Sequence, residues 1–383
     1  MTPFDFQPRT RIVFGPGKID ALGELASELG GRRALVVSDP GVIEAGHTER
    51  GRKALERAGI VTFLFDEVHE NPTTDDVNAG LKIAMRHDPE IIIGLGGGSS
   101  MDCAKGINFL YTNGGDIQDY WGFGKALHAM LPMIAVPTTS GTGSETQSYA
   151  LISDAKSHVK MACGDKKAAF RAAILDPKLT VTQPQRVTAL TGIDAIAHAL
   201  ETFVTKRRNP ASLAFSREAW HLLAGNFARV LEQPDDLDAR SGMQLGACFA
   251  GMAIENSMLG AAHALANPLT TDYEVPHGQA VGMMLAHVIR FNAGAVGHWY
   301  RDLLEVTGGT NGFPDPERGA EGLADFVSTL VQLAGLPARL SELGVEENRL
   351  PSLAAAAAQQ WTANFNPRQV GQVELLEIYR RAY

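Results

Sequence analysis

The chain has 383 residues, of which 45% are hydrophobic and 20% charged, with 34 Lys and Arg against 43 Asp and Glu. This length predicts two or more domains, because one hydrophobic core seldom organises more than about 250 to 300 residues. The net charge of −9 argues against a protein that binds nucleic acid or an anionic membrane, because both kinds of binding require clustered positive charge. We therefore expect no nucleic-acid partner and no membrane partner.

The cysteine content and the N-terminus indicate the cellular setting. Three scattered cysteines, Cys103, Cys163 and Cys248, are too few for a disulfide framework or a thiolate metal cluster. Residues 1–9 lack the apolar segment of a secretory signal. The longest stretch without Lys, Arg, Asp or Glu, residues 126–144, is interrupted by prolines and glycines, so it is not expected to span a membrane. We predict a reducing, cytoplasmic protein.

In the first half of the chain, short β-branched runs alternate with amphipathic stretches. Strands are predicted at residues 11–14, 34–38, 61–65, 90–94, 132–136 and 172–175. Helices are predicted at 19–29 and 74–85, the latter preceded by a turn and cap signal at 71–73. This alternation predicts right-handed crossovers and a parallel sheet with helices on both faces.

A glycine-rich segment, residues 94–100, follows the fourth predicted strand and leads into a helical segment with Asp102 and Lys105. A strand, glycines and a helix start let backbone N–H groups and the helix dipole bind a pyrophosphate. The spacing matches neither G-x-G-x-x-G nor a P-loop, because Lys105 lies too far along the helix. A flexible turn is therefore the alternative interpretation.

Two further polar features follow predicted strands. Asp39 comes after strand 34–38, where a carboxylate suits ribose hydroxyls and repels a 2′-phosphate, although a lone Asp at a strand end is more often a turn residue. Residues 137–144 form a loop of small hydroxyl residues and glycines after strand 132–136. Such loops at the carboxyl edge of a parallel sheet are what a dinucleotide site requires.

The character of the sequence changes at Pro184. From there Ala, Leu and Glu follow helical periodicity to the C-terminus, and no strand is predicted. We predict a domain boundary within residues 183–187, with an α/β domain at 1–185 and an all-helical domain at 186–383.

A candidate metal constellation lies in the helical part. Asp194 and His198 are four residues apart, which places them on one helix face, and His263 and His277 flank a predicted helix end and turn. One carboxylate and three imidazoles suit Fe(II), Zn(II) or a similar cation. A single His on an apolar helix is usually a core residue, but unpaired charges among small apolar residues would be costly here. The other eight histidines are interpreted as surface or structural.

Together these motifs resemble the iron-containing (group III) alcohol dehydrogenase family, and the resemblance covers essentially the whole chain. So many ordered motifs are far more specific than any one of them. The matching motifs are Phe14-Gly15-x-Gly17, Gly96-Gly97-Gly98-Ser99-x-x-Asp102-x-x-Lys105, Pro137-Thr138-Thr139-x-Gly141-Thr142-Gly143-Ser144-Glu145, Thr191-Gly192-x-Asp194-Ala195-x-Ala197-His198-Ala199-x-Glu201, Gly260-x-x-His263-Ala264-x-Ala266, Pro276-His277-Gly278 and Asn366-Pro367-Arg368.

The resemblance implies an α/β N-terminal Rossmann-like dinucleotide-binding domain followed by an all-α C-terminal metal-binding domain, a dehydroquinate synthase-like architecture. It implies a catalytic Fe(II), with Zn(II) or another divalent metal possible, held by Asp194, His198, His263 and His277. It also implies an NAD site, with Asp39 favouring NAD over NADP. The other residues expected to line that site are Asn71, Gly97, Gly98, Ser99, Asp102, Thr138, Thr139, Thr142 and Lys160.

Two positions depart from the family pattern. Asn267, four residues after His263, stands where the family usually has a further histidine. The side-chain amide of Asn267 cannot titrate as a histidine does. The role of this position in proton relay or substrate placement is therefore uncertain. After Glu145, Thr146 to Tyr149 replaces a more usual Val-Thr pair. Candidate substrate-pocket residues are Tyr149, Leu151, Ile254 and Trp361, and their largely apolar character favours a short aliphatic or diol substrate.

The resulting hypothesis is an enzyme that interconverts a small primary alcohol or diol and its aldehyde by hydride transfer to or from NAD, as a homodimer or higher homo-oligomer. A hydroxyacid–oxoacid transhydrogenase, a polyol dehydrogenase and a dehydroquinate-synthase-like lyase are enzymatic alternatives. A non-catalytic binding protein is disfavoured, because all four ligand positions are filled.

Overall fold

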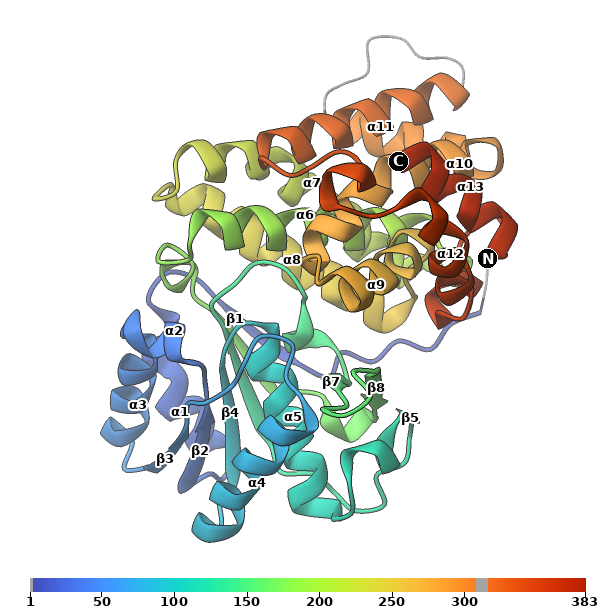
Figure 1. Cartoon of the computed structure of the whole chain (residues 1–383). Coiled ribbons are helices and arrows are strands. Elements are labelled where there is room, and N and C mark those ends of the chain that lie inside the picture. The colour runs from blue at the N-terminus through green and yellow to red at the C-terminus, as the bar shows by residue number, and fades with distance from the viewer. Residues whose placement is uncertain (1–2, 308–315) are drawn as a thin grey trace. The chain divides into compact units, whose positions relative to one another are not determined.

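The computed structural model describes residues 3–307 and 316–383. The chain divides into two compact units (Figure 1), an α/β unit of residues 7–183 and a helical unit that begins at Pro184. Residues 3–6 group with the helical unit, where the Phe6 ring lies 5.8 Å from the ring of Phe215. The predicted limits at residue 185 did not anticipate this contribution. The assignment of one domain to the dinucleotide and the other to the metal stays a prediction.

The α/β unit is built on a six-stranded sheet with strand order β1-β9-β6-β4-β2-β3, in which every pairing is parallel. The strands are β1 (Arg11–Phe14), β2 (Arg33–Val37), β3 (Val61–Phe65), β4 (Ile91–Gly96), β6 (Met133–Pro137) and β9 (Ala172–Leu175). All six predicted strands are confirmed, with ends that differ by at most two residues. Non-consecutive neighbours such as β4 and β6 bring the loops that follow them to one edge of the sheet.

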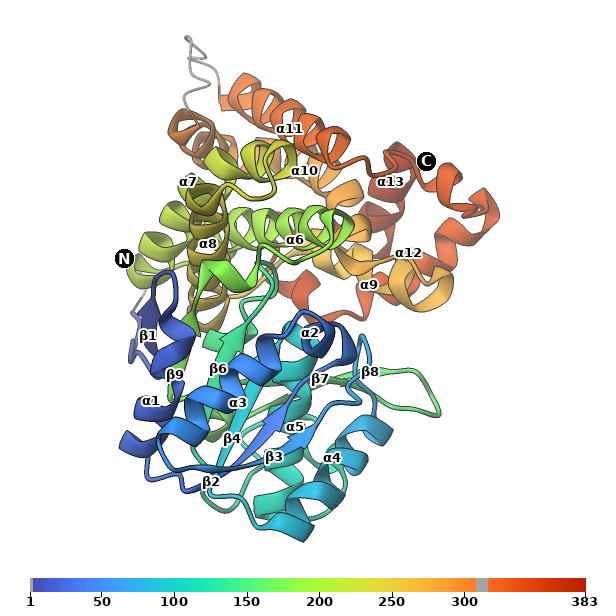
Figure 2. The ribbon, with the colours of Figure 1, turned by 90° about the vertical axis from the view of Figure 1, so that its left-hand side faces the viewer.

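Helices cover both faces of this sheet because its strands are apolar on both sides (Figures 1 and 2). Leu35 and Val37 of β2 belong to the core formed with α4 (Thr74–His87) and α5 (Gly98–Asn113). Val36 points to the opposite face, whose core includes α1 (Leu22–Glu28) and α3 (His47–Arg57). The predicted helix at 74–85 is confirmed as α4, and Thr73 caps it in a capping box with Asp76.

A second, three-stranded sheet was not predicted. It has the order β5-β8-β7, with β5 (Gly122–Phe123), β7 (Tyr149–Ser153) and β8 (Lys160–Gly164), and β7 runs antiparallel to β8. These strands are short, and they carry lysine, glycine and alanine, which are poor strand formers, so their pattern is weak. The pairing still positions three predicted site residues, Tyr149, Leu151 and Lys160.

The helical unit contains no strand among its described residues, as expected. Its main helices are α6 (Gln185–Val204), α7 (Pro210–Glu232), α8 (Leu237–Asn256), α9 (Ala261–Tyr273), α10 (His277–Val306), α11 (Pro316–Leu333), α12 (Leu350–Ala358) and α13 (Gln372–Ala382). Ile193, Ile196 and Leu200 of α6 share one core with Trp220 and Phe227 of α7. Helix α6 is therefore fixed on several sides, which gives its polar residues defined positions.

Two helices, α6 and α10, have the length and apolar composition of a membrane span, yet 83% and 72% of their apolar windows are buried inside the protein. Such burial is typical of the core helices of a folded unit, which are apolar on most sides.

Candidate metal centre and dinucleotide site

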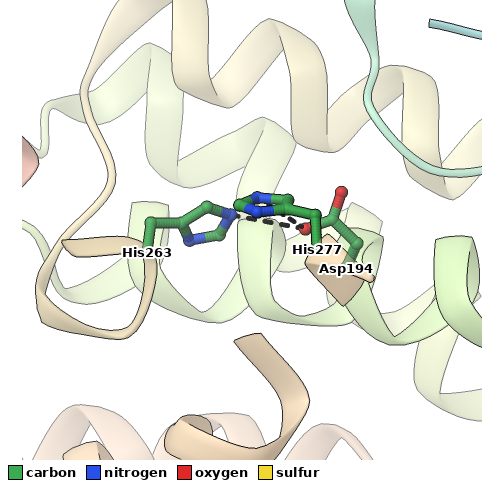
Figure 3. A group of neighbouring side chains, drawn as sticks. All are labelled: Asp194, His263 and His277. Atoms are coloured by element: carbon green, nitrogen blue, oxygen red, sulfur yellow. Dashed lines mark ion pairs between the residues drawn. The ribbon is translucent and has the colours of Figure 1, made fainter. Parts of the chain in front are cut away.

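Three helices of the helical unit bring a carboxylate and two imidazoles together (Figure 3). Asp194 lies on α6, His263 on the first turn of α9, and His277 at the start of α10. Their ligand atoms all lie within 4.8 Å of one another. The Oδ1 atom of Asp194 is 3.4 Å from Nε2 of His263 and 3.8 Å from Nε2 of His277.

His198, one turn after Asp194 on α6, lies at the same place. Its Nε2 atom is 3.5 Å from Oδ1 of Asp194, and its ring lies 4.8 Å from the ring of His263 at an interplanar angle of 18°. The three histidines predicted to hold the metal therefore surround one carboxylate oxygen of Asp194, the fourth predicted ligand, although the roles of all four as ligands stay a prediction.

The burial of this cluster supports the fit of a cation. Asp194 and His263 are only 6% and 4% exposed. Among the described residues, Oδ1 of Asp194 and Nε2 of His263 are buried atoms without a hydrogen-bond partner. Each buried polar atom that lacks a hydrogen-bond partner lowers the stability of the folded state by about 1 to 3 kcal/mol. An oxygen and nitrogen donor set around one point is suited to a divalent transition metal, which would satisfy both atoms.

The electrostatics of the cluster are strongly coupled. Burial alone would raise the pKa of Asp194, but the neighbouring His198, His263 and His277 hold this pKa below its usual range. Burial would lower the pKa of His263, but Glu201 and Asp194 outweigh it and raise the pKa to about 9. The cluster thus favours an ionised carboxylate beside positive charge, as a metal site does.

Glu201 was part of a quoted motif but received no predicted role. Its Oε2 atom lies 2.5 Å from Nδ1 of His263, and its Oε1 atom accepts a hydrogen bond from the backbone N–H of Ala262 at 2.8 Å. The sequence did carry a signal that Glu201 lies near the cluster. Asp194, His198 and Glu201 are spaced i, i+4 and i+7, which places them on one helix face.

Asn267, which replaces the usual family histidine, lies one helical turn after His263 on α9. Its Nδ2 atom donates a hydrogen bond of 2.9 Å to Oε1 of Gln360. Two amides therefore pair at this position, and neither can exchange a proton near neutral pH.

In the α/β unit, the two predicted dinucleotide loops lie side by side. The backbone N–H of Thr138 donates to the carbonyl of Gly96 at 3.0 Å, which joins the loop after β6 to the loop after β4. A Cβ atom on Gly98 would lie 2.7 Å from Cγ2 of Thr142, so only glycine permits this approach. A Cβ atom on Gly97 would lie 3.4 Å from Cγ2 of Thr139, which is an ordinary van der Waals contact.

Other predicted dinucleotide residues are linked by hydrogen bonds. The backbone N–H of Asn71 donates to Oγ of Ser99 at 3.2 Å, and Nζ of Lys160 donates to Oδ1 of Asn71 at 3.2 Å. Asp39 has two partners, because Oδ1 caps α2 (Pro40–Glu44) and Oδ2 accepts from Oγ of Ser100 at 2.9 Å. A predicted ribose ligand is thus also a helix cap, which combines the two interpretations of Asp39.

Asp102 lies in a buried network that sequence reasoning did not identify. Ser144 donates its hydroxyl proton to Asp102 at 2.6 Å, and the ammonium of Lys105 lies 3.6 Å from the same carboxylate oxygen. Burial raises the pKa of Asp102, opposed by the charge of Lys105. Lys105 itself is fully buried, and its position three residues after Asp102 is the signal that could have identified the pair.

The four predicted substrate-pocket residues belong to different units. Tyr149 and Leu151 point to one side of β7, and Leu151 is 38% exposed. In the helical unit, Ile254 is buried near the end of α8 and Trp361 is 42% exposed. That these four residues line one pocket stays a prediction.

An α/β unit with adjoining glycine and threonine loops and, in the same chain, a helical cluster of a carboxylate and imidazoles are features expected of a metal-dependent dehydrogenase. The chain belongs to the iron-containing alcohol dehydrogenase family. Residues 8–177 match the family model "Iron-containing alcohol dehydrogenase", and residues 188–383 match "Fe-containing alcohol dehydrogenase family, C-terminal". Membership confirms the resemblance and the fold class, and it implies NAD(H) and a metal as cofactors.

Individual relatives match along their full length. The chain is 35% identical to the 1,3-propanediol dehydrogenase of Citrobacter freundii, covering 99% of each chain, and 30% identical to the NAD-dependent methanol dehydrogenase of Bacillus methanolicus, covering 100% of each. A solved 1,3-propanediol oxidoreductase superposes with a TM-score of 0.97 at 34% identity, covering 100% of both chains.

Proposed function

We propose that this protein is a metal-dependent, NAD(H)-linked oxidoreductase that interconverts a small primary alcohol or diol and its aldehyde by hydride transfer. The observation that carries the proposal is the pair of buried atoms without hydrogen-bond partners among the described residues, Oδ1 of Asp194 and Nε2 of His263. Because the chain belongs to the iron-containing alcohol dehydrogenase family, a metal ion is the expected partner of these two atoms. Relatives named for 1,3-propanediol and methanol support a short alcohol or diol as substrate.

Asp194, His198, His263 and His277 are the proposed ligands, and Fe(II) is the proposed metal, with Zn(II) or another divalent ion as the alternative. A divalent ion at this cluster supplies Lewis-acid chemistry, which lowers the pKa of an alcohol hydroxyl or polarises an aldehyde carbonyl. The burial of Asp194 and His263 excludes bulk water, so the charges of the cluster interact strongly. Asn267 cannot accept the alcohol proton, so proton release does not use the side chain at this position.

NAD(H) is proposed to bind the α/β unit, which corresponds to the predicted domain 1–185. The N–H groups of Gly97, Gly98 and Ser99 at the start of α5 offer donors for the pyrophosphate. Lys160 adds a positive charge, held in position by its hydrogen bond to Asn71. Asp39 disfavours a 2′-phosphate by charge repulsion. The remaining proposed contacts are Asp102, Thr138, Thr139 and Thr142.

We further propose that the enzyme is cytoplasmic and forms a homodimer or higher homo-oligomer. Cys103, Cys163 and Cys248 are all buried and lie outside any disulfide in the described part of the chain, in agreement with a reducing compartment. Light scattering on the purified protein tests the oligomeric state.

The experiment that tests the proposed function follows NADH absorbance. Protein stripped with a chelator is reloaded with Fe(II) or Zn(II) and supplied with NAD and a series of short alcohols and diols. We expect NADH formation only with metal, and its loss in His263→Ala. The matched control is His298→Ala, an exposed histidine on α10, which should keep full activity.

Other results would contradict the proposal in different ways. Full activity in His263→Ala would refute the metal site. Turnover of a hydroxy acid with an oxo acid, without added NAD, would favour a transhydrogenase. Retention of NAD without net NADH formation would favour a lyase.

A further inference from the structure

We propose that Glu201 is a positioning residue for the metal centre: its carboxylate holds the proton of His263 on Nδ1, so that Nε2 presents a lone pair beside Asp194. The inference rests on the proposed metal site and assigns a role to a residue outside the ligand set. Glu201 itself lies on α6, seven residues after Asp194, and is 3% exposed.

The geometry of the carboxylate assigns a separate partner to each oxygen. Oε2 lies 2.5 Å from Nδ1 of His263, and Oε1 accepts from the backbone N–H of Ala262 at 2.8 Å. A carboxylate oxygen only accepts hydrogen bonds, so Nδ1 must carry the proton. In the neutral ring, Nε2 then has the free lone pair, and this atom lies 3.4 Å from Oδ1 of Asp194.

The start of α9 gives the Glu201 carboxylate one of its two roles. The cap residue Gly260 has no side chain, so the first N–H groups of the helix need acceptors from elsewhere. Asn366 accepts from Ala261 at 3.3 Å through Oδ1, and Glu201 accepts from Ala262. A Cβ atom on Gly260 would lie 3.1 Å from Oε1 of Glu201. A carboxylate at a helix N-terminus is also favoured by the helix dipole.

Capping alone does not account for Glu201. Asn366 shows that a neutral amide oxygen satisfies an N–H group at this helix end. A buried carboxylate is more costly to desolvate than an amide, and it is stabilised here by donors from the same turn of α9 that carries His263. The second oxygen of Glu201 bonds the His263 ring. A carboxylate that bonds a ligating histidine from outside the ligand set fixes the tautomer and the orientation of that histidine.

Glu201→Gln separates the two roles. The glutamine carbonyl can still accept from Ala262, but the amide N–H group then faces Nδ1 of His263. Nδ1 must become an acceptor, which moves the ring proton to Nε2 and removes the lone pair that would bind the metal. Asn366→Ala is the matched control, because it removes the other cap of α9 without touching His263.

The test measures binding of Co(II) alone to metal-free protein, by its visible absorption and by competition with a chelator, without cofactor or alcohol. We expect Glu201→Gln to bind Co(II) about 10 to 100-fold more weakly than wild type, with a similar Tm in the metal-free state. Asn366→Ala should lower the Tm and keep the wild-type affinity. Equal affinity of Glu201→Gln and wild type, or equal weakening in both variants, would overturn the inference.

A second measurement needs no variant. In wild-type protein labelled with 15N-histidine and loaded with Zn(II), His263 should carry its ring proton on Nδ1. A proton on Nε2 would overturn the inference. If wild type binds no metal at all, the proposed metal site is refuted and the inference with it; if wild type binds tightly and only the Glu201 results fail, the proposed function stands alone.

Discussion

The buried ammonium of Lys105 donates to both the backbone oxygen and the hydroxyl of Ser144, at 2.9 and 2.8 Å. It also donates to the carbonyl of Tyr149 at 2.7 Å. One lysine on α5 thereby joins the helix that follows the glycine loop to the loop that follows β6. The positions of the two proposed dinucleotide loops therefore depend on a fully buried charge.

Lys105→Met should therefore weaken NAD binding and stability together. The variant removes three charge-assisted hydrogen bonds and leaves Asp102 without its nearest cation, and breaking such a buried pair costs about 3 to 5 kcal/mol. The expected results are a clearly lower Tm and a raised KM for NAD. Lys82→Met, at an exposed lysine on α4, is the control. An unchanged KM for NAD in a folded Lys105→Met protein would show that the loops are positioned without this lysine.

We expect the stability of the protein to depend on pH through the buried Glu145. Burial raises its pKa from 4.5 to about 7, opposed by the charge of Lys105. Between these values the native state keeps a proton that the unfolded chain releases, so stability falls as the pH rises through this window, by up to about 3 kcal/mol. Below the lower value both states are protonated, and the group contributes no pH dependence.

Thermal unfolding at pH values from 5 to 8 tests this prediction. Glu145→Gln cannot ionise, so its Tm should fall less than that of wild type as the pH rises, and it should be the more stable protein at the alkaline end. The exposed Glu24→Gln on α1 serves as the control. Parallel pH curves for Glu145→Gln and wild type would contradict the assignment.

Two substitutions of Asp39 separate its role as the cap of α2 from its proposed role in selecting NAD over NADP. Asp39→Asn keeps an acceptor for the N–H of Val42 and removes the charge, whereas Asp39→Ala loses the cap and about 1 kcal/mol of stability. Both variants should relax discrimination against NADP by about tenfold or more, because the like charge is gone. The measurement is the ratio of kcat/KM for NAD and NADP. An unchanged ratio in both variants would leave Asp39 as a helix cap only.

Asn267→His should introduce a titration that wild type lacks at this position. The new imidazole would replace an amide paired with Gln360, and its ordinary pKa is about 6.5. We expect the profile of kcat/KM against pH to gain an inflection in that region. Asn267→Gln, which keeps an amide, should show none. Superimposable profiles for Asn267→His and wild type would mean that a histidine here has no part in proton transfer.

Local patterns in the sequence determined the secondary structure and the class of the fold. Short apolar, β-branched runs that end at Gly, Asp or Pro defined the six parallel strands, since side-chain alternation and apolar runs are properties of neighbouring residues. The spacing of Asp194 and His198 placed two candidate ligands on one face of α6 for the same reason. The weak strands β7 and β8 were missed because their stability comes from pairing with each other.

Only the tertiary structure decided which distant residues meet. His263 and His277 reach Asp194 because α9 and α10 pack with α6, and packing depends on the whole core of the helical unit. The same holds for Glu201 against His263 and for Lys105 against Ser144, where buried polar groups select partners from other segments of the chain. Sequence spacing is informative within a helix or strand, whereas contacts between elements follow from how their apolar faces are buried.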